Sequence, residues 1–139
     1  MKLLLDSSAI VKRYKRETGH DLVDRLLMAA DAVVLAAHCK MEIASSLSRE
    51  VHDRSIDLAQ YDHAMSEVAQ DFVDFDVWPV SPEIEARAIS AMAHNRLRAV
   101  DALHIGTAQA ARVDLFVTAD RKQALAAHAV GLKTELIEA

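Results

Sequence analysis

The sequence predicts an α/β protein in which a parallel β-sheet is covered by helices on both faces. Short apolar runs alternate along the chain with segments whose apolar residues recur every three or four positions. These are the patterns of buried strands and amphipathic helices, and their alternation is typical of a parallel sheet. Only 3 glycines and 2 prolines occur in 139 residues, so we expect tight connections and no long linker.

The first third of the chain contains two expected strands and two expected helices. Residues 2–5 and 32–36 are short apolar runs. Between them, residues 8–14 predict a short helix, and residues 21–30 carry leucine and valine in a helical stripe. Gly19 marks the break between these two helices.

The middle of the chain is mostly helical. Residues 38–53 place apolar side chains on one side, and residues 57–72 carry them at spacings of three or four. We expect these two helices to form a helical hairpin, over about residues 38–74, that protrudes as a subfeature. Residues 75–80 alternate in part between apolar and polar and predict a strand.

Helix-boundary residues organise the last third. Ser81, Pro82 and Glu83 combine an N-cap serine, a first-turn proline and an acid, and predict a helix that continues to about residue 94. Asp120 and Gln123 are spaced like a capping box, which predicts a helix over residues 120–129. The other expected elements are a helix rich in small residues at 100–111 and strands at 115–118 and 134–137.

Length and composition indicate one domain over residues 1–139 with a single core. Cys39 is the only cysteine, which excludes a disulfide within the chain and fits a reducing cytoplasm. Asp6 ends the N-terminal apolar run too early for a signal peptide, and no apolar stretch approaches the roughly 20 residues of a membrane span. We therefore expect a soluble cytoplasmic protein.

Four carboxylates stand at or near the start of expected helices: Asp6, Glu42, Asp101 and Asp120. Asp6, Glu42 and Asp120 also follow expected strands, and strand ends of one polarity share one edge of a parallel sheet. We therefore expect the four acids to meet in one crevice. Taken singly, each acid could be only a helix cap, although Asp101 lies in an apolar segment and needs a partner.

Four acids in one crevice repel each other unless a cation lies among them. Carboxylates without a cysteine cluster suit Mg²⁺ or Mn²⁺ better than zinc. Such an ion can activate a bound water and stabilise a leaving oxygen, which is the chemistry of phosphodiester hydrolysis. No catalytic triad or glycine-rich phosphate loop is present in the sequence.

The formal net charge of −5 argues at first against a nucleic-acid substrate, because such proteins usually show a basic surface. The four acids account for most of this charge, so the rest of the chain is close to neutral. Local basic groups could then hold phosphates beside a cut site, and a solvated charged face is the alternative for each. The candidate phosphate contacts are Lys12, Arg13, Arg121 and Lys122.

Several polar neighbours of the acids have two interpretations each. Ser7, Ser8 and Thr118 could support the pocket by hydrogen-bonding a carboxylate, or could serve only local capping. His104, one helical turn after Asp101, could orient water or substrate, or could simply pack.

His38 lies four residues before Glu42, and both could contact a metal ion. A surface histidine near a helix start is the simpler interpretation of His38.

The segments around the four acids resemble those of PIN-domain proteins, and more narrowly the VapC-type toxins of bacterial toxin–antitoxin pairs. The resemblance spans nearly the whole chain, in order and at the expected spacing. It rests on Leu5-Asp6-Ser7-Ser8-Ala9, Met41-Glu42-Ile43-Ala44-Ser45, Asp101-Ala102-Leu103-His104-Ile105 and Val117-Thr118-Ala119-Asp120-Arg121.

The resemblance implies a PIN domain, which is a Rossmann-like sheet with a helical hairpin. It implies Mg²⁺ or Mn²⁺ held by Asp6 and Asp101, with Glu42 and Asp120 completing the site directly or through water. It also implies endonucleolytic cleavage of RNA, a small antitoxin whose tail covers the site, and a homodimer. Many relatives carry a further acid about one turn after the position of Asp101, where this sequence has His104, so we expect one firm metal site.

The leading hypothesis is a metal-dependent endoribonuclease, the toxin of a toxin–antitoxin pair. In it, Asp6, Asp101 and Asp120 hold the ion and Glu42 orients the attacking water. One alternative is a catalytically silent PIN-like binding module. Another is a phospho-acceptor signalling domain, which would require an acceptor aspartate after the third strand, where none follows.

Overall fold

Five parallel strands form the centre of the protein, in the order β3-β2-β1-β4-β5. The computed structural model describes residues 1–138. The strands are β1 (Lys2–Leu5), β2 (Ala32–Ala36), β3 (Asp76–Trp78), β4 (Leu115–Thr118) and β5 (Thr134–Leu136). The predicted parallel sheet is therefore confirmed.

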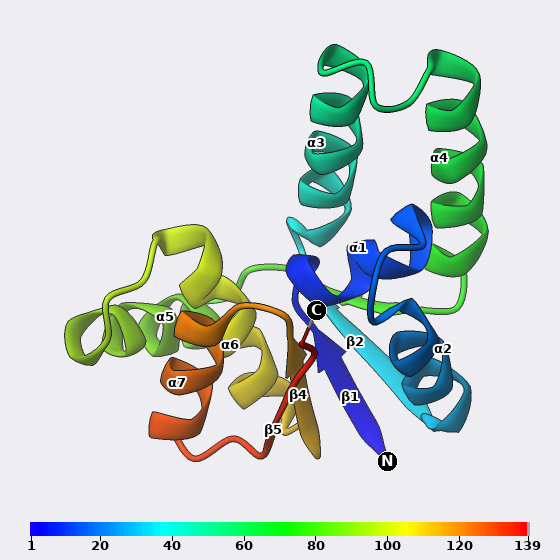
Figure 1. Cartoon of the computed structure of the whole chain (residues 1–139). Coiled ribbons are helices and arrows are strands. Elements are labelled where there is room, and N and C mark those ends of the chain that lie inside the picture. The colour runs from blue at the N-terminus through cyan, green and yellow to red at the C-terminus, as the bar shows by residue number, and fades with distance from the viewer. Residues whose placement is uncertain (139) are drawn as a thin grey trace.

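Seven helices in residues 1–138 flank this sheet, in the order that the sequence predicted (Figure 1). They are α1 (Ser7–Lys15), α2 (His20–Ala29), α3 (Cys39–His52), α4 (Leu58–Phe72), α5 (Pro82–His94), α6 (Ala99–Ala111) and α7 (Arg121–Ala129). None of these helices has the length and hydropathy that a membrane span requires.

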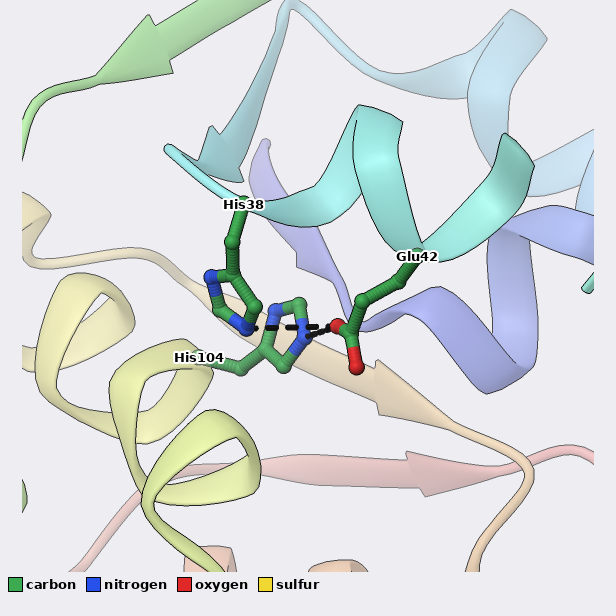
Figure 2. A group of neighbouring side chains, drawn as sticks. All are labelled: His38, Glu42 and His104. Carbon is green, nitrogen blue, oxygen red and sulfur yellow. Dashed lines mark hydrogen bonds and ion pairs between the residues drawn. The ribbon is translucent and has the colours of Figure 1, made fainter. Parts of the chain in front are cut away.

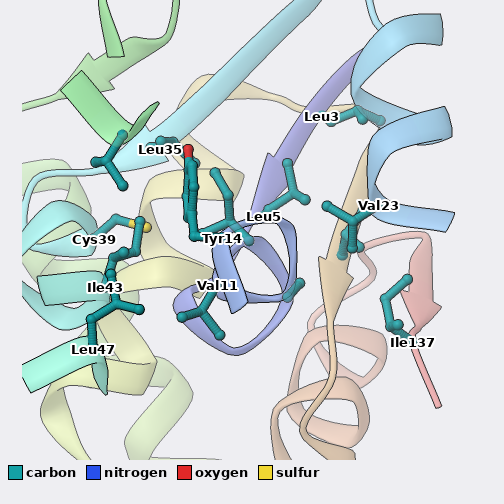
Figure 3. Close-up of a cluster of buried hydrophobic side chains, with 14 of the residues drawn as sticks. Leu3, Leu5, Val11, Tyr14, Val23, Leu35, Cys39, Ile43, Leu47 and Ile137 are labelled. Carbon is teal, nitrogen blue, oxygen red and sulfur yellow. The ribbon is translucent and has the colours of Figure 1, made fainter. Parts of the chain in front are cut away.

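Two hydrophobic clusters lie on opposite faces of the sheet, and β1 contributes to both. Leu3 and Leu5 face the cluster shared with α1, α2, α3 and α4, whereas Leu4 faces the cluster shared with α5, α6 and α7. Figure 3 shows the first cluster. All three leucines are fully buried because successive strand residues point to opposite faces and both faces are covered.

Helices α3 and α4 form the predicted hairpin, which extends away from the sheet in Figure 1. Asp57 starts α4 with a capping box, in which its side chain accepts from the Gln60 backbone and the Gln60 side chain accepts from the Asp57 backbone. At the other end of α4, Asp71 accepts hydrogen bonds from Arg13 Nε at 2.8 Å and from the Tyr14 hydroxyl at 2.7 Å. These bonds fix the base of the hairpin to α1.

Helix α6 packs closely on α5 at Gly106. A Cβ atom at this position would lie 2.6 Å from the backbone oxygen of Ile84. The abundance of small residues in this segment of the sequence therefore has a packing reason.

The third strand is shorter than predicted, because β3 ends at Trp78 and not at Val80. Trp78 pairs with Ala36, the last residue of β2, so the next residues have no strand beside them. Pro79 also lacks the N–H group that a ladder would need.

Candidate active site

The structure brings the four acids together in one cleft of about 350 Å³ at the carboxyl ends of the strands. Asp6 directly follows β1, Glu42 lies in the first turn of α3 after β2, and Asp120 caps α7 after β4. Asp101 reaches the same edge from the first turn of α6. The convergence expected from the sheet geometry is observed, and the catalytic and metal-binding roles of these acids stay predictions.

Asp6 is both the N-cap of α1 and a wall of the cleft, and it is only 3% exposed. Its Oδ1 accepts hydrogen bonds from the Ser8 hydroxyl at 2.7 Å and from the Ala9 backbone at 3.1 Å. Its Oδ2 accepts a hydrogen bond from the Thr118 hydroxyl. The pairing of Leu5 with Val117 brings Thr118 next to Asp6. The two predicted interpretations of Asp6, cap and site residue, are thus compatible.

The Asp6 carboxyl is poorly solvated. Burial raises its pKa, and the nearby His104 and the hydrogen bonds to the carboxylate offset this only in part. A bound cation would favour the ionised form of this group. The environment of Asp6 therefore fits a metal ligand.

Glu42 Oε1 has two hydrogen-bond donors and a third close neighbour. The Ser7 hydroxyl donates at 2.6 Å and His104 Nε2 at 2.7 Å, and His38 Nε2 lies 3.2 Å away. Figure 2 shows both imidazoles directed at this oxygen. Burial alone would raise the pKa of Glu42, but these hydrogen bonds outweigh it and hold the pKa well below its usual range.

These contacts define how each imidazole is protonated. His38 Nε2 also lies 2.7 Å from the carbonyl oxygen of Val100, so this nitrogen carries a proton and donates it. His104 Nε2 faces Glu42 and, at 3.3 Å, the Ser7 hydroxyl, which itself donates to Glu42. The interpretation of His38 as a surface histidine is wrong, because its side chain is only 13% exposed and bonded to Glu42.

The ligand atoms of His38, Glu42 and His104 lie within 4.8 Å of one another, so they form a second arrangement that could hold an ion. An ion there would have to replace the proton that His38 donates to Val100. The Nδ1 atoms of both histidines are buried without a partner among residues 1–138, whereas a metal-bound histidine usually donates through its second nitrogen. Hydrogen bonding therefore accounts for this cluster better than coordination does.

The carboxylates of the cleft are better suited to an ion. Within residues 1–138, Glu42, Asp101 and Asp120 each use one carboxylate oxygen for side-chain or backbone hydrogen bonds and keep the other without a donor. Several oxygen donors facing one cleft are the ligand set that Mg²⁺ and Mn²⁺ prefer. The residues present thus fit the predicted ion.

Two of the four predicted phosphate contacts have other partners in the structure. Lys12 is only 7% exposed and donates to the carbonyl oxygen of Thr18 at 3.0 Å. Arg13 donates to Asp71 and, at 2.7 Å, to Asp24, so it joins α1 to α4 and α2. These contacts argue against the predicted phosphate role of Lys12 and Arg13, because both side chains are held by other groups of the fold.

The other two predicted contacts, Arg121 and Lys122, are exposed beside Asp120. Arg121 lies 3.5 Å from Glu138.

Two arginines that the sequence reasoning missed line the cleft. Arg49 lies seven residues after Glu42, which is two helical turns along the same face of α3. Arg98 is the N-cap residue of α6, and its Nε lies 3.3 Å from Asp101 Oδ2. Helical spacing from each acid was the signal in the sequence that could have found them.

The fold and the cleft define an α/β protein with an acidic site at the carboxyl edge of a parallel sheet. The sequence matches the PIN domain over residues 3–129. The chain belongs to the PIN-domain family.

Several solved structures are similar to this chain in fold. FitAcB from Neisseria gonorrhoeae is 16% identical, with a TM-score of 0.73 and 95% of each chain covered. DNA-bound VapBC from Salmonella typhimurium is 13% identical, with a TM-score of 0.71 and 97% of each chain covered.

VapC20 from Mycobacterium tuberculosis, described as a toxin that cleaves the sarcin–ricin loop, is 16% identical, with a TM-score of 0.68. It is covered over 95% of its length by 94% of this chain. A search of curated proteins finds no match.

Proposed function

We propose that the protein is a Mg²⁺- or Mn²⁺-dependent endoribonuclease and the toxin of a toxin–antitoxin pair. The observation that carries this proposal is the meeting of Asp6, Glu42, Asp101 and Asp120 in one cleft of a PIN domain. Carboxylates from four separate segments have no reason to share a cleft for stability alone, because like charges in proximity disfavour the folded state.

Asp6, Asp101 and Asp120 would hold the ion through their carboxylate oxygens. When bound, the ion supplies positive charge at the phosphate and lowers the pKa of a bound water. Ser7 and His104 fix Glu42 Oε1, and Oε2 has no donor within residues 1–138, so Oε2 would accept a hydrogen bond from the attacking water in a defined direction. Ser8 and Thr118 keep Asp6 in place.

RNA is the proposed substrate because a relative of the same fold, VapC20, is described as cleaving the sarcin–ricin loop. A small antitoxin is the proposed partner because similar structures include a toxin–antitoxin complex from Klebsiella pneumoniae and VapBC complexes. The resemblance of the sequence to VapC-type toxins also supports a homodimer, and the single cysteine supports action in a reducing cytoplasm.

The test is cleavage of end-labelled RNA by the purified protein. We expect cleavage with Mg²⁺ or Mn²⁺, loss of cleavage in excess chelator, and a decrease of at least about 100-fold in Asp6→Asn. The matched control is Asp62→Asn, since Asp62 is an exposed aspartate on α4 outside the cleft. Circular dichroism checks that both variants fold.

Full cleavage by Asp6→Asn, or by the wild-type protein in chelator, would contradict the proposal. Binding of metal and RNA without any cleavage would favour the silent binding module instead.

A further inference from the structure

A second hollow, of about 370 Å³, adjoins the acidic cleft. The two share Arg98, Asp101 and Asp120 in their walls, so the second hollow borders the acidic cleft. The walls that belong to the second hollow alone are formed by Arg96, Leu97, Lys122 and Gln123. None of these four residues has a role in the proposed hydrolysis.

Cations dominate this second hollow. Arg96 and Lys122 are exposed, and neither has an acidic partner within 4.0 Å among residues 1–138. Arg98 contacts Asp101, but its side chain is 78% exposed and can also reach a ligand. Three cations around one hollow, two of them without a counter-charge, suit an anion.

Gln123 joins α7 to α6, the two helices that border the hollow. It is 1% exposed, and its Nε2 donates to the carbonyl oxygen of Asp101 at 2.8 Å. This bond fixes the orientation of the amide, because the reverse orientation would place two acceptor oxygens together. The Gln123 Oε1 atom then has no donor within residues 1–138, although it is buried in the wall of the hollow.

We propose that this hollow is a subsite for the nucleotide next to the scissile phosphate of a single-stranded RNA. Arg96 and Lys122 bind the neighbouring phosphate, and Leu97 contacts the base or sugar. The phosphate adds the negative charge that the free cations lack. This subsite rests on the proposed function, since RNA is its ligand. It would also orient the RNA chain relative to the four carboxylates of the cleft.

The subsite can be tested by binding alone. In the Asp6→Asn background, the affinity for a fluorescent single-stranded RNA oligonucleotide is measured by anisotropy in Mg²⁺ over a series of salt concentrations. We expect Arg96→Ala combined with Lys122→Ala to raise Kd about tenfold or more. The slope of log Kd against log salt should fall by about 0.7, the value for one phosphate that is no longer neutralised.

The matched control is Arg87→Ala combined with Lys133→Ala, which removes the same charge elsewhere. Arg87 lies on α5 outside both hollows, and Lys133 precedes β5, at the edge of the sheet opposite the acids. We expect this control to keep the Kd of the parent within about twofold. In the cleaving protein, loss of the subsite should raise KM and leave kcat unchanged.

Equal Kd and equal salt slope in the Arg96→Ala/Lys122→Ala variant and its control would overturn the subsite. The subsite would also be overturned if the Arg96→Ala/Lys122→Ala variant lost binding to a poly-glutamate peptide but kept its affinity for RNA. The hollow would then bind an acidic protein segment. Absence of cleavage by the wild-type protein contradicts the proposed function and leaves the binding result readable, so the two failures are distinguishable.

Discussion

His104 Nε2 lies 2.7 Å from Glu42 Oε1, so a buried imidazole on α6 fixes a carboxylate on α3. His104 is 1% exposed, and it occupies the place where the resemblance leads one to expect a further acid. The imidazole is a donor to Glu42 in this contact, where an acid would add negative charge. The contact thus favours one ion in the cleft, together with a glutamate whose free oxygen has a fixed direction.

We predict that His104→Asn lowers kcat for RNA cleavage by about 10- to 100-fold, the range found when an outer partner of a site ligand is removed. The reason is that Glu42 loses a charge-assisted hydrogen bond and its defined orientation, while RNA contacts persist, so KM should change little. Single-turnover cleavage of labelled RNA measures both.

The control is His63→Asn, because His63 also faces a glutamate one turn away, at 3.5 Å, but is 80% exposed on α4. We expect wild-type kinetics from this control. A His104→Asn protein that is folded and equally active would show that the histidine only packs.

We predict that Asp6→Asn raises the thermal midpoint of the metal-free protein at neutral pH. The pKa of Asp6 is raised on folding, so its contribution to stability is present below its unfolded pKa and is lost as pH rises through the folded pKa. Ionisation of the buried Asp6 as the pH rises therefore opposes folding, and a neutral amide avoids this cost.

Calorimetry across pH 5 to 8, with and without Mn²⁺, measures this effect. Mn²⁺ should stabilise the wild-type protein and should stabilise Asp6→Asn much less. A lower midpoint for Asp6→Asn at every pH would show that the capping of α1 matters more than the burial of charge.

We predict that Gly106→Ala destabilises the protein by about 1–3 kcal/mol, the range for overpacking a core. In an exposed helix this change would stabilise, because alanine is the better helix former. Here the new methyl group meets the backbone oxygen of Ile84, which cannot move without shifting α5. Urea unfolding gives the change, with the exposed Ser90→Ala on α5 as the control expected to stay near the wild type.

We predict that Arg13→Ala lowers stability by about 1–3 kcal/mol, because Asp71 and Asp24 lose charged hydrogen bonds in a partly buried network. The control is Arg87→Ala, whose single contact with Glu83 is exposed and worth about 0.3–0.5 kcal/mol. Urea unfolding of both variants compares them.

Arg13→Ala should also retain RNA affinity at a temperature where it is folded. A large loss of RNA affinity with unchanged stability would instead indicate that Arg13 contacts an RNA phosphate, as the sequence first predicted.

The helices and strands could be predicted from the sequence because their periodicities are local. β2 and β4 lie at the predicted residues, and the helix ends differ from the prediction by at most one residue. In α3, α4 and α7 the difference is a capping residue, which lies just outside the helix. The strand β3 was predicted too long, since its end depends on where β2 stops. The meeting of the four acids followed from the rule that parallel strands end at one edge.

What the sequence by itself determined is the order of elements, the parallel sheet and the edge at which Asp6, Glu42, Asp101 and Asp120 gather. Only the tertiary structure decided which side chains touch them. Glu42 and His104 are 62 residues apart, and Arg13 and Asp71 are 58 apart. Such contacts depend on how whole helices pack, so no local pattern could separate the buried Lys12 from the exposed Lys122 beside the acids.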